Sequence, residues 1–388
     1  MFNTIISHHY LKEQGKEYFW SIGEETTTGL LAGSLLSSDI VRVRFLRGPH
    51  IDEARYQLVD GNEGTLPYHS WIVAKGDEQW DTPGSRSDVT TLLQPYLQGF
   101  AFSPRELRLT HPLTKNERIY GFGERTGYMN KRGQAFPIWN IDVPGHHHDS
   151  VSTMYTSIPF FVGLQVGPHV ETARAYGVLI DHTGKIDVDM GKTEELTASM
   201  TVEGDSLVVY FFAGPAIADV LRQYSELTGH MPLPARWTLG HHQSRWSYMS
   251  ERQVDDIANR LRTGHHPCDA IWLDIDYMDG YKNFTFNPDR FPDPASMANR
   301  LHQHGFHLVT ILDPGTKVDE DYNVYRQGLE RDYFCRNTSG ELFIGTVWPG
   351  ACVFPDFSRS DVRGWWGSLY KRLLDQGVDA IWNDMDEP

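Results

Sequence analysis

The first 230 residues contain many short runs in which apolar and polar side chains alternate. Such alternation places every second side chain on one face of the chain and is typical of a half-buried β-strand. Alternation, or a run of β-branched and aromatic residues, predicts strands at 41–45, 158–162, 176–180 and 207–212. Helical periodicity is scarce here, apart from a short segment at 216–224. The pattern predicts that residues 1–230 form an all-β domain, a β-sandwich.

The pattern changes after residues 231–234, where two prolines predict a stiff linker. From there to residue 388, strand-like and helix-like segments alternate. We expect strands at 237–240, 270–274, 307–312 and 379–382, and helices at 250–261, 296–301 and 361–374. Ser250 followed by Gln253 is typical of a helix N-terminus with a capping box. Alternation of this kind predicts a parallel sheet with right-handed crossovers, so the fold class of the chain is α/β plus all-β.

One eight-residue segment occurs twice. Residues 269–276 and 379–386 are identical at six of eight positions, and each ends in a pair of aspartates around one intervening residue. The aspartates that follow predicted strands are Asp274, Asp276, Asp313, Asp384 and Asp386. Acidic residues at the carboxyl ends of parallel strands lie where (β/α) barrels have their active sites. The alternative is that each aspartate caps the next helix. Because three strands share the feature, we favour a site.

Four parallel strands are half of the eight that close a (β/α)8 TIM barrel. We therefore expect residues 231–388 to form the first half of such a barrel, which would leave strand edges open. The rest of the barrel is expected to come from later residues of a longer protein or from a second chain.

The net charge restricts the class of partner. Lys and Arg total 35 against 51 Asp and Glu, which gives a formal charge of −16. Such a chain is poorly suited to nucleic acid, whose phosphates require clustered basic residues, or to an anionic membrane. The sequence has neither an apolar run of about 18 residues nor a recognisable secretory signal. Three scattered cysteines fit neither a disulfide framework nor a zinc motif, so we expect a cytoplasmic protein.

Aromatic residues make up 12% of the chain. Their flat faces stack on the C–H faces of sugars, although they serve equally well in a hydrophobic core. Together with the paired carboxylates, they suggest glycoside hydrolysis, which requires one acid or base and one carboxylate around an oxocarbenium-like centre. A metal-dependent hydrolase that uses His146, His147 and His148 is the weaker alternative, because three consecutive side chains splay apart.

Several segments resemble glycoside hydrolase family 31, the family of α-glucosidases and α-xylosidases. Residues 381–388, Ile-Trp-Asn-Asp-Met-Asp-Glu-Pro, resemble its nucleophile motif. The other similar segments are 121–124, 243–246, 272–278 and 313–314. The resemblance runs from about residue 119 to the end of the chain, and the predicted sandwich suits the family's N-terminal domain. It implies retaining hydrolysis of α-linked sugars, with no metal and no other cofactor.

The resemblance also implies roles for individual residues. Asp384 would be the catalytic nucleophile, and Asp274 would bind hydroxyl groups of the non-reducing sugar. The other substrate-binding residues that it implies are Asp142, Trp246, Ile275, Ile311, Trp348 and Met385. The family's acid/base aspartate would lie beyond Pro388, so we expect residues 1–388 alone to be inactive and poorly soluble.

Position 386 departs from the family pattern, because this chain has Asp where the family usually has Asn. If the strand continued, Asp386 would share a face with Asp384 and raise the pKa of that carboxyl by like-charge repulsion. If the chain turns there, Asp386 would instead cap the following helix, which is the interpretation we favour.

The predicted function is that of a retaining, exo-acting α-glucosidase that removes terminal glucose from α-linked oligosaccharides through a glycosyl-enzyme on Asp384. An α-xylosidase or an α-glucan transglucosylase of the same family uses the same nucleophile and stays open, as does a catalytically silent sugar-binding subunit. A homo-oligomer is compatible with the sequence, whereas nucleic-acid and membrane partners are not expected.

Overall fold

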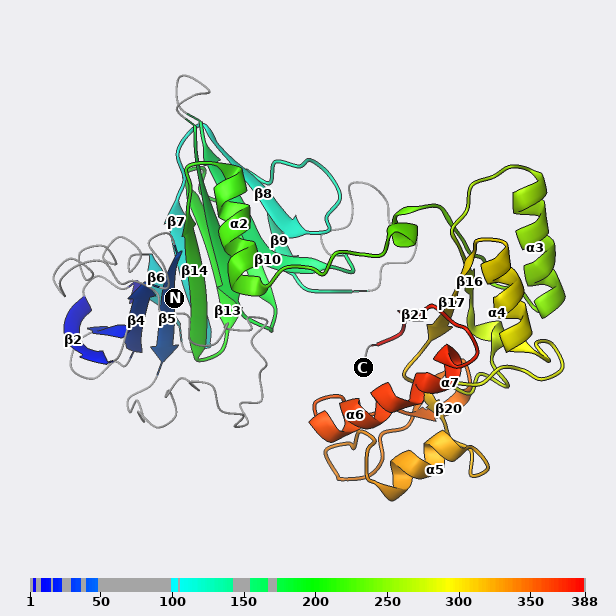
Figure 1. The fold of residues 1–388 in the computed structure, drawn as a ribbon. Coiled ribbons are helices and arrows are strands. Elements are labelled where there is room, and N and C mark those ends of the chain that lie inside the picture. The colour runs from blue at the N-terminus through cyan, green and yellow to red at the C-terminus, as the bar shows by residue number, and fades with distance from the viewer. Residues whose placement is uncertain are drawn as a thin grey trace. The chain divides into compact units, whose positions relative to one another are not determined.

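The computed structural model describes residues 3–4, 8–14, 17–22, 29–35, 40–47, 99–103, 105–141, 154–166 and 173–386. The chain divides into two compact units, Met1–Met231 and Pro232–Pro388 (Figure 1). Among the helices built from these residues, none combines the length and the apolar character needed to cross a bilayer.

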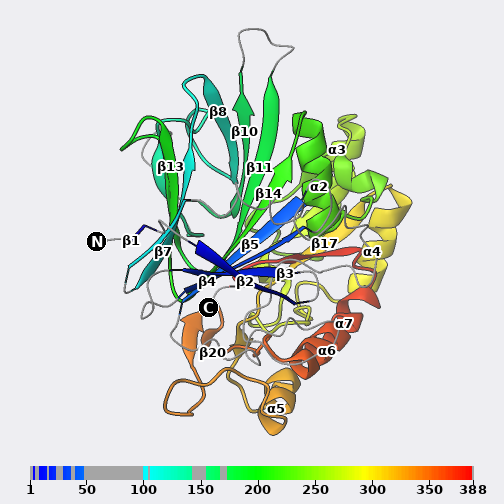
Figure 2. The ribbon, with the colours of Figure 1, turned by 90° about the vertical axis from the view of Figure 1, so that its left-hand side faces the viewer.

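The first unit is a sandwich of two antiparallel sheets. One sheet has the strand order β2-β3-β4-β5-β14-β11-β10-β8, and the other has the order β1-β6-β7-β13-β12-β9. The strands are β1 (Asn3–Thr4), β2 (His8–Gln14), β3 (Glu17–Ile22), β4 (Gly29–Leu35), β5 (Ile40–Arg47), β6 (Phe100–Phe102), β7 (Glu106–Pro112), β8 (Glu117–Gly123), β9 (Ala135–Ile138), β10 (Ser157–Gln165), β11 (Arg174–Asp181), β12 (Ile186–Met190), β13 (Thr197–Glu203) and β14 (Ser206–Ala213). The four strands named in the sequence analysis correspond to β5, β10, β11 and β14, which lie side by side in Figure 2, and the sandwich is confirmed.

The core of the first unit lies between the two sheets. Alternation is clear in β12, where Ile186 and Val188 are buried and Asp187 is exposed. Inward residues of both sheets join one buried cluster, for example Phe45 of β5 and Leu107 of β7. The outer face of the larger sheet is covered by α2 (Ile217–Thr228), which contacts β11 and β14 (Figure 1).

A buried carboxylate connects β8 with β11. Glu117, only 3% exposed, accepts hydrogen bonds from the Thr114 backbone N–H at 2.8 Å and from the hydroxyl groups of Thr114 and Tyr176. Burial raises the pKa of Tyr176, and the negative charge of Glu117 and the hydrogen bond to it raise that pKa further. The phenol therefore stays protonated and keeps donating to Glu117 throughout the physiological pH range.

We expect Tyr176→Phe to lower the free energy of unfolding of the first unit by about 1–3 kcal/mol, because it leaves a buried carboxylate oxygen without its donor. Urea unfolding at pH 7 measures the change. Tyr128→Phe is the matched control, because Tyr128 is 85% exposed and its replacement should cost less than about 0.5 kcal/mol. Equal stability of the Tyr176→Phe protein and the wild type would contradict this account of Glu117.

The second unit contains a parallel sheet with the strand order β15-β16-β17-β21 and a small antiparallel sheet with the order β18-β20-β19. Its strands are β15 (His242–Gln243), β16 (Ala270–Leu273), β17 (His307–Leu312), β18 (Thr316–Lys317), β19 (Gly345–Val347), β20 (Gly350–Val353) and β21 (Ala380–Asn383). Its helices are η4 (Arg236–Leu239), α3 (Glu251–Thr263), η5 (Ile275–Tyr277), α4 (Pro294–Gln303), α5 (Asn323–Glu330), α6 (Ser360–Leu369) and α7 (Lys371–Leu374). The predicted combination of an all-β domain and a parallel α/β half-barrel is confirmed.

Two local predictions were wrong. Residues 237–240 do not form a strand, because most of them belong to the 3₁₀ helix η4, whose backbone N–H groups bond within the segment. For example, the N–H of Gly240 donates to Trp237 O at 3.1 Å. The first barrel strand is the shorter β15. Ser250 accepts from the Gln253 N–H at 3.4 Å, as predicted, but the Gln253 side chain accepts from the Met249 N–H at 2.8 Å and so does not close the capping box.

The register of the parallel strands separates two faces of the sheet. Ile271, Leu273, Leu308 and Leu312 share one face and belong to a buried cluster with residues of α3 and α4. Figure 1 shows α4 beside these strands and α3 beside α4. Trp272 pairs with Val309, and Ile311 pairs with Trp382, on the opposite face. In a (β/α) barrel the face away from the helices is the interior, so these residues define the interior face.

Candidate functional site

Three aspartates follow the parallel strands directly: Asp274 after β16, Asp313 after β17 and Asp384 after β21. Each comes two residues after a member of the interior face, respectively Trp272, Ile311 and Trp382. Because side chains alternate along a strand with a period of two, the three aspartates continue this face at the carboxyl edge of the sheet. That edge is the active-site edge of (β/α) barrels.

Asp274 and Asp384 share one electrostatic environment. Burial raises the pKa of Asp274, and the negative charges of Asp276 and Asp384 add to this effect. The opposing contribution is the Ile275 N–H, which donates to Asp274 Oδ1 at 2.7 Å at the start of η5. Two carboxylates that are 110 positions apart in the sequence therefore lie within electrostatic range of each other, and their joint role in a site stays a prediction.

The chain turns directly after Asp384. The Asp384 N–H donates to Leu312 O at 3.4 Å, and β21 ends at Asn383. Met385 has a φ of +57°, in the left-handed region that side chains rarely adopt. Asp386 therefore does not continue the strand face of Asp384, which removes the first of the two alternatives considered for this residue. Left-handed residues of this kind are concentrated at functional sites.

Two exposed tryptophans lie together in this unit. Trp246 follows β15 and is 67% exposed, and Trp348, between β19 and β20, is 49% exposed. Their ring centroids are 5.8 Å apart, with an interplanar angle of 55°. Trp246 is also connected to the aspartate-bearing loop after β16, because its Nε1–H donates to Asp276 Oδ2 at 3.1 Å. Exposed indole faces beside carboxylates are suited to stacking on a sugar ring.

The other predicted site residues have different surroundings. Ile275, in η5, and Ile311, on the interior face of β17, are both buried and belong to the core cluster of this unit. The Tyr277 hydroxyl donates to the Ile311 carbonyl at 2.9 Å and connects η5 to β17 there. Asp142 lies outside the described residues, as do the three consecutive histidines. Within the described ranges, no three His, Cys, Asp or Glu side chains are grouped to hold a metal ion.

Two residues of this site, Trp382 and Tyr281, were not expected from the sequence. Trp382 is half-buried on the interior face, with its ring centroid 5.9 Å from that of Trp272. Its position two residues before Asp384 was the available signal, since a period of two places both on one face. Tyr281, whose hydroxyl donates to Asp276 at 3.1 Å, carried no signal, because the contact depends on how the loop folds back.

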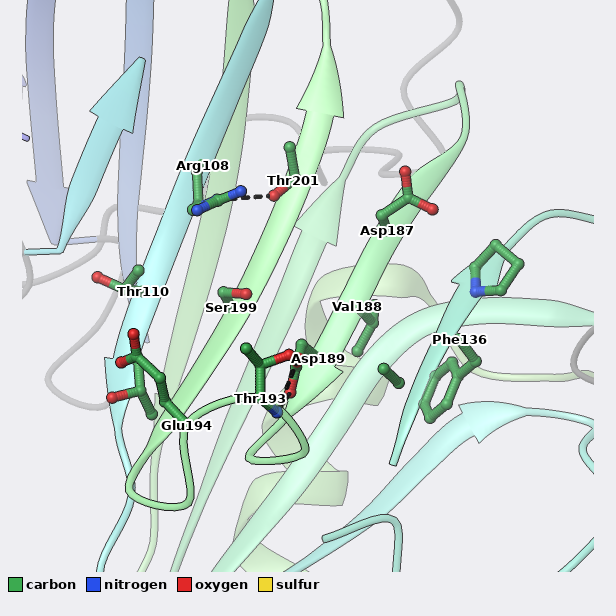
Figure 3. A pocket seen from close by; sticks show the side chains of 13 residues that line it. Arg108, Thr110, Phe136, Asp187, Val188, Asp189, Thr193, Glu194, Ser199 and Thr201 are labelled. Atoms are coloured by element: carbon green, nitrogen blue, oxygen red, sulfur yellow. Dashed lines mark hydrogen bonds between the residues drawn. The ribbon is translucent and has the colours of Figure 1, made fainter. Parts of the chain in front are cut away.

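A polar groove of about 480 Å³ lies on the outer face of the smaller sheet in the first unit (Figure 3). Outward side chains of β7, β12 and β13 form its floor, and within it Arg108 Nε donates to Thr201 at 3.0 Å. Among the described residues that line the groove, Phe136 alone is aromatic, and its side chain is buried in the core. Because these lining residues include no exposed ring, the carboxylate edge of the barrel sheet is the better candidate site.

A parallel half-barrel whose strands end in clustered aspartates, next to paired exposed tryptophans, defines a carbohydrate-active (β/α) barrel. The chain belongs to glycoside hydrolase family 31. Residues 231–388 match the family 31 TIM-barrel domain, and residues 83–189 match the family 31 N-terminal galactose mutarotase-like domain.

Relatives and solved structures agree with this assignment. The chain is 41% identical over 292 residues to alpha-glucosidase 2 of Bacillus thermoamyloliquefaciens and 37% identical over 276 residues to an alpha-glucosidase of Saccharolobus solfataricus. These alignments include 75% and 71% of the chain but only 36% and 38% of the relatives' lengths. A family 31 dextranase of Flavobacterium johnsoniae shares the fold, with a TM-score of 0.78 at 22% identity over 98% of this chain and 47% of its own.

Proposed function

We propose that this chain carries the nucleophile and part of the sugar-binding subsite of a retaining, exo-acting α-glucosidase. The observation that supports this most directly is that Asp274 follows β16 and Asp384 follows β21, at the carboxyl edge of one parallel sheet, where barrel enzymes act. The negative charge of Asp384 also contributes to the raised pKa of Asp274. The similarity to two alpha-glucosidases supports the choice of substrate class.

In this proposal, Asp384 attacks the anomeric carbon of a terminal α-linked glucose. The C1–O bond to the leaving group breaks as the bond from C1 to the Asp384 carboxylate forms, which gives a β-linked glycosyl-enzyme. Water then attacks C1 from the opposite face and displaces the carboxylate, while its proton passes to the group that had protonated the leaving oxygen. Two inversions return the α-anomer. The proton for the leaving oxygen is expected from an acid on the strands that complete the barrel, outside residues 1–388.

The remaining residues hold the sugar. Asp274 accepts hydrogen bonds from its hydroxyl groups, while Trp246 and Trp348 provide apolar faces for the ring. Met385, held in a left-handed conformation directly after the nucleophile, packs beneath the ring. The family resemblance also assigns Asp142, which lies outside the described residues, to substrate binding. Ile275 and Ile311, both buried, line the pocket that binds the sugar, as the family resemblance implies.

Time-resolved proton NMR of hydrolysis tests the proposed reaction. With p-nitrophenyl α-glucoside, we expect the full-length enzyme to release α-glucose first, with β-glucose appearing only through mutarotation. The corresponding α-xyloside should react at least about tenfold more slowly, and a metal chelator should have no effect. Initial release of β-glucose would exclude a retaining mechanism, and predominant formation of longer glucosides would indicate the transglucosylase.

We further propose that residues 1–230 and 231–388 act as separate sandwich and barrel domains, which is supported by the family match that begins at residue 231. A cytoplasmic location is supported by Cys268, Cys335 and Cys352, none of which is in a disulfide. The partner that this proposal requires is the rest of the barrel, and the substrate is an α-linked oligosaccharide.

A further inference from the structure

Asp276 uses both of its carboxylate oxygens within the protein. Its side chain is buried, with 8% of the residue exposed. Oδ2 accepts from Trp246 Nε1–H and Oδ1 accepts from the Tyr281 hydroxyl, both at 3.1 Å. Burial, followed by the hydrogen bond to Asp276 and the negative charge of that carboxylate, raises the pKa of Tyr281, so the phenol remains a donor. Asp274, only two positions away, is proposed to bind the sugar, whereas the Asp276 carboxylate is occupied by two protein donors.

The segment that carries Asp276 is held on both sides. The neighbouring residue Tyr277 is fully buried, and its hydroxyl donates to the Ile311 carbonyl of β17 at 2.9 Å. The Tyr277 carbonyl accepts from the Asn287 N–H at 2.8 Å. Because backbone and side-chain bonds fix this turn against a central strand, the Asp276 carboxylate has a defined position.

Trp246, by contrast, is 67% exposed, and an exposed indole is free to change rotamer unless a specific contact holds it. The hydrogen bond to Asp276 is such a contact, and it connects the loop after β15 with the loop after β16. It sets the angle at which the Trp246 ring meets Trp348, whose centroid is 5.8 Å away. Holding a binding side chain in place before the ligand arrives reduces the entropy lost on binding.

We propose that Asp276 is a positioning residue. Its carboxylate, which also accepts a hydrogen bond from Tyr281, holds the Trp246 indole in the orientation that receives the terminal sugar. The expected effect on catalysis rests on the proposed function. The hydrogen bond from Trp246 to Asp276 does not, because it is present in the structure of this chain. The positioning role differs from the role of Asp274, because the Asp276 carboxylate serves as an acceptor for two protein donors and not as a sugar ligand.

Two substitutions distinguish the positioning role of Asp276 from a direct effect of its negative charge on the reaction. Asp276→Asn keeps an oxygen for the Trp246 N–H and offers an amide N–H to the Tyr281 oxygen, so it preserves both contacts without the charge. Asp276→Ala removes both contacts. Asp289→Asn is the matched control, because Asp289 lies in the same connecting segment between β16 and α4, and is exposed.

The first readout is the indole ¹H–¹⁵N resonance of Trp246 in the full-length enzyme, assigned with Trp246→Phe. We expect a clear shift in Asp276→Ala, a much smaller one in Asp276→Asn and none in Asp289→Asn. An unchanged resonance in a folded Asp276→Ala protein would overturn the proposal. If Asp276→Ala does not fold, a large shift in Asp276→Asn would overturn it instead, because that variant retains the acceptor.

The second readout is the kinetics of the full-length enzyme with p-nitrophenyl α-glucoside. We expect Asp276→Ala to raise KM about tenfold with kcat within about threefold of the wild type, and Asp276→Asn to restore most of the KM. A loss of kcat that is equal in both variants would overturn the positioning role, because it would show that the charge acts on the reaction. If the wild-type enzyme released no glucose, the proposed function would fail, while the indole resonance would still decide whether Asp276 holds Trp246.

Discussion

Replacement of Asp384 by Asn is expected to lower kcat of the full-length enzyme by roughly 10⁴–10⁶-fold, the scale seen when a covalent nucleophile is removed. The amide is nearly isosteric with the carboxylate but is a poor nucleophile toward an anomeric carbon, so no glycosyl-enzyme forms. The fold should be preserved, because the contact of residue 384 with β17 is made by its backbone N–H, which donates to Leu312 O.

The matched control is Asp386→Asn, two positions further along. Met385 turns the chain between the two aspartates, and the substitution introduces the residue that the family usually has at this position. We expect kcat within about threefold of the wild type. A cyclophellitol-type α-glucosyl probe should label the wild type and the control at Asp384, as peptide mass spectrometry would show. Labelling at another residue, or activity within tenfold in Asp384→Asn, would contradict the assignment.

Asp274→Asn is expected to lower kcat/KM by about 10²–10⁴-fold and at the same time to raise thermal stability. The loss of activity follows because two hydrogen bonds from sugar hydroxyls to a charged acceptor contribute about 1.5–3 kcal/mol each. The gain in stability follows from the raised pKa, which burial causes and the charges of Asp276 and Asp384 increase. The wild-type carboxylate is thus more costly to ionise in the folded chain than in the unfolded chain.

The direction of the pH dependence follows from this shift. A carboxyl group whose pKa is raised by folding binds its proton more tightly in the native state, so stability falls as the pH rises from its ordinary pKa, about 4, through the raised value. Asn does not titrate, so the variant should lack this decrease. Thermal melts of the wild type, Asp274→Asn and the exposed control Asp289→Asn between pH 3 and pH 7 would measure it. The prediction fails if Asp274→Asn is less stable than the control at pH 7.

Hydrophobic periodicity was sufficient to predict the longer strands and helices, whose apolar residues form one complete face. The strand His307–Leu312 was predicted with its observed ends, because a short run rich in β-branched and aliphatic residues between two helical patterns has few alternatives. Residues 237–240 were wrongly expected to be a strand, since a segment of only four residues satisfies its backbone groups equally well by i→i+3 hydrogen bonds. Short segments depend on their neighbours, which periodicity does not describe.

The same division applies to the candidate site. Asp274 and Asp384 were predicted because each follows a strand of a repeated segment, and the parallel topology brings such ends together. The turn at Met385 was left open between two alternatives, because a left-handed φ at a methionine is set by the surrounding fold and not by the residue's own preference. The contact from Trp246 to Asp276 joins two loops 30 positions apart and had no local signal.

The sequence by itself therefore determined the two-part architecture, the parallel order of the barrel strands and the carboxylates at their ends, since alternation and spacing encode which face each side chain occupies. Only the tertiary structure decided which aspartate accepts from protein donors, which one shares the environment of Asp384, and how the exposed indoles lie. Those outcomes depend on distances and burial between separate loops, and these exist only once the strands have paired and the helices have packed against them.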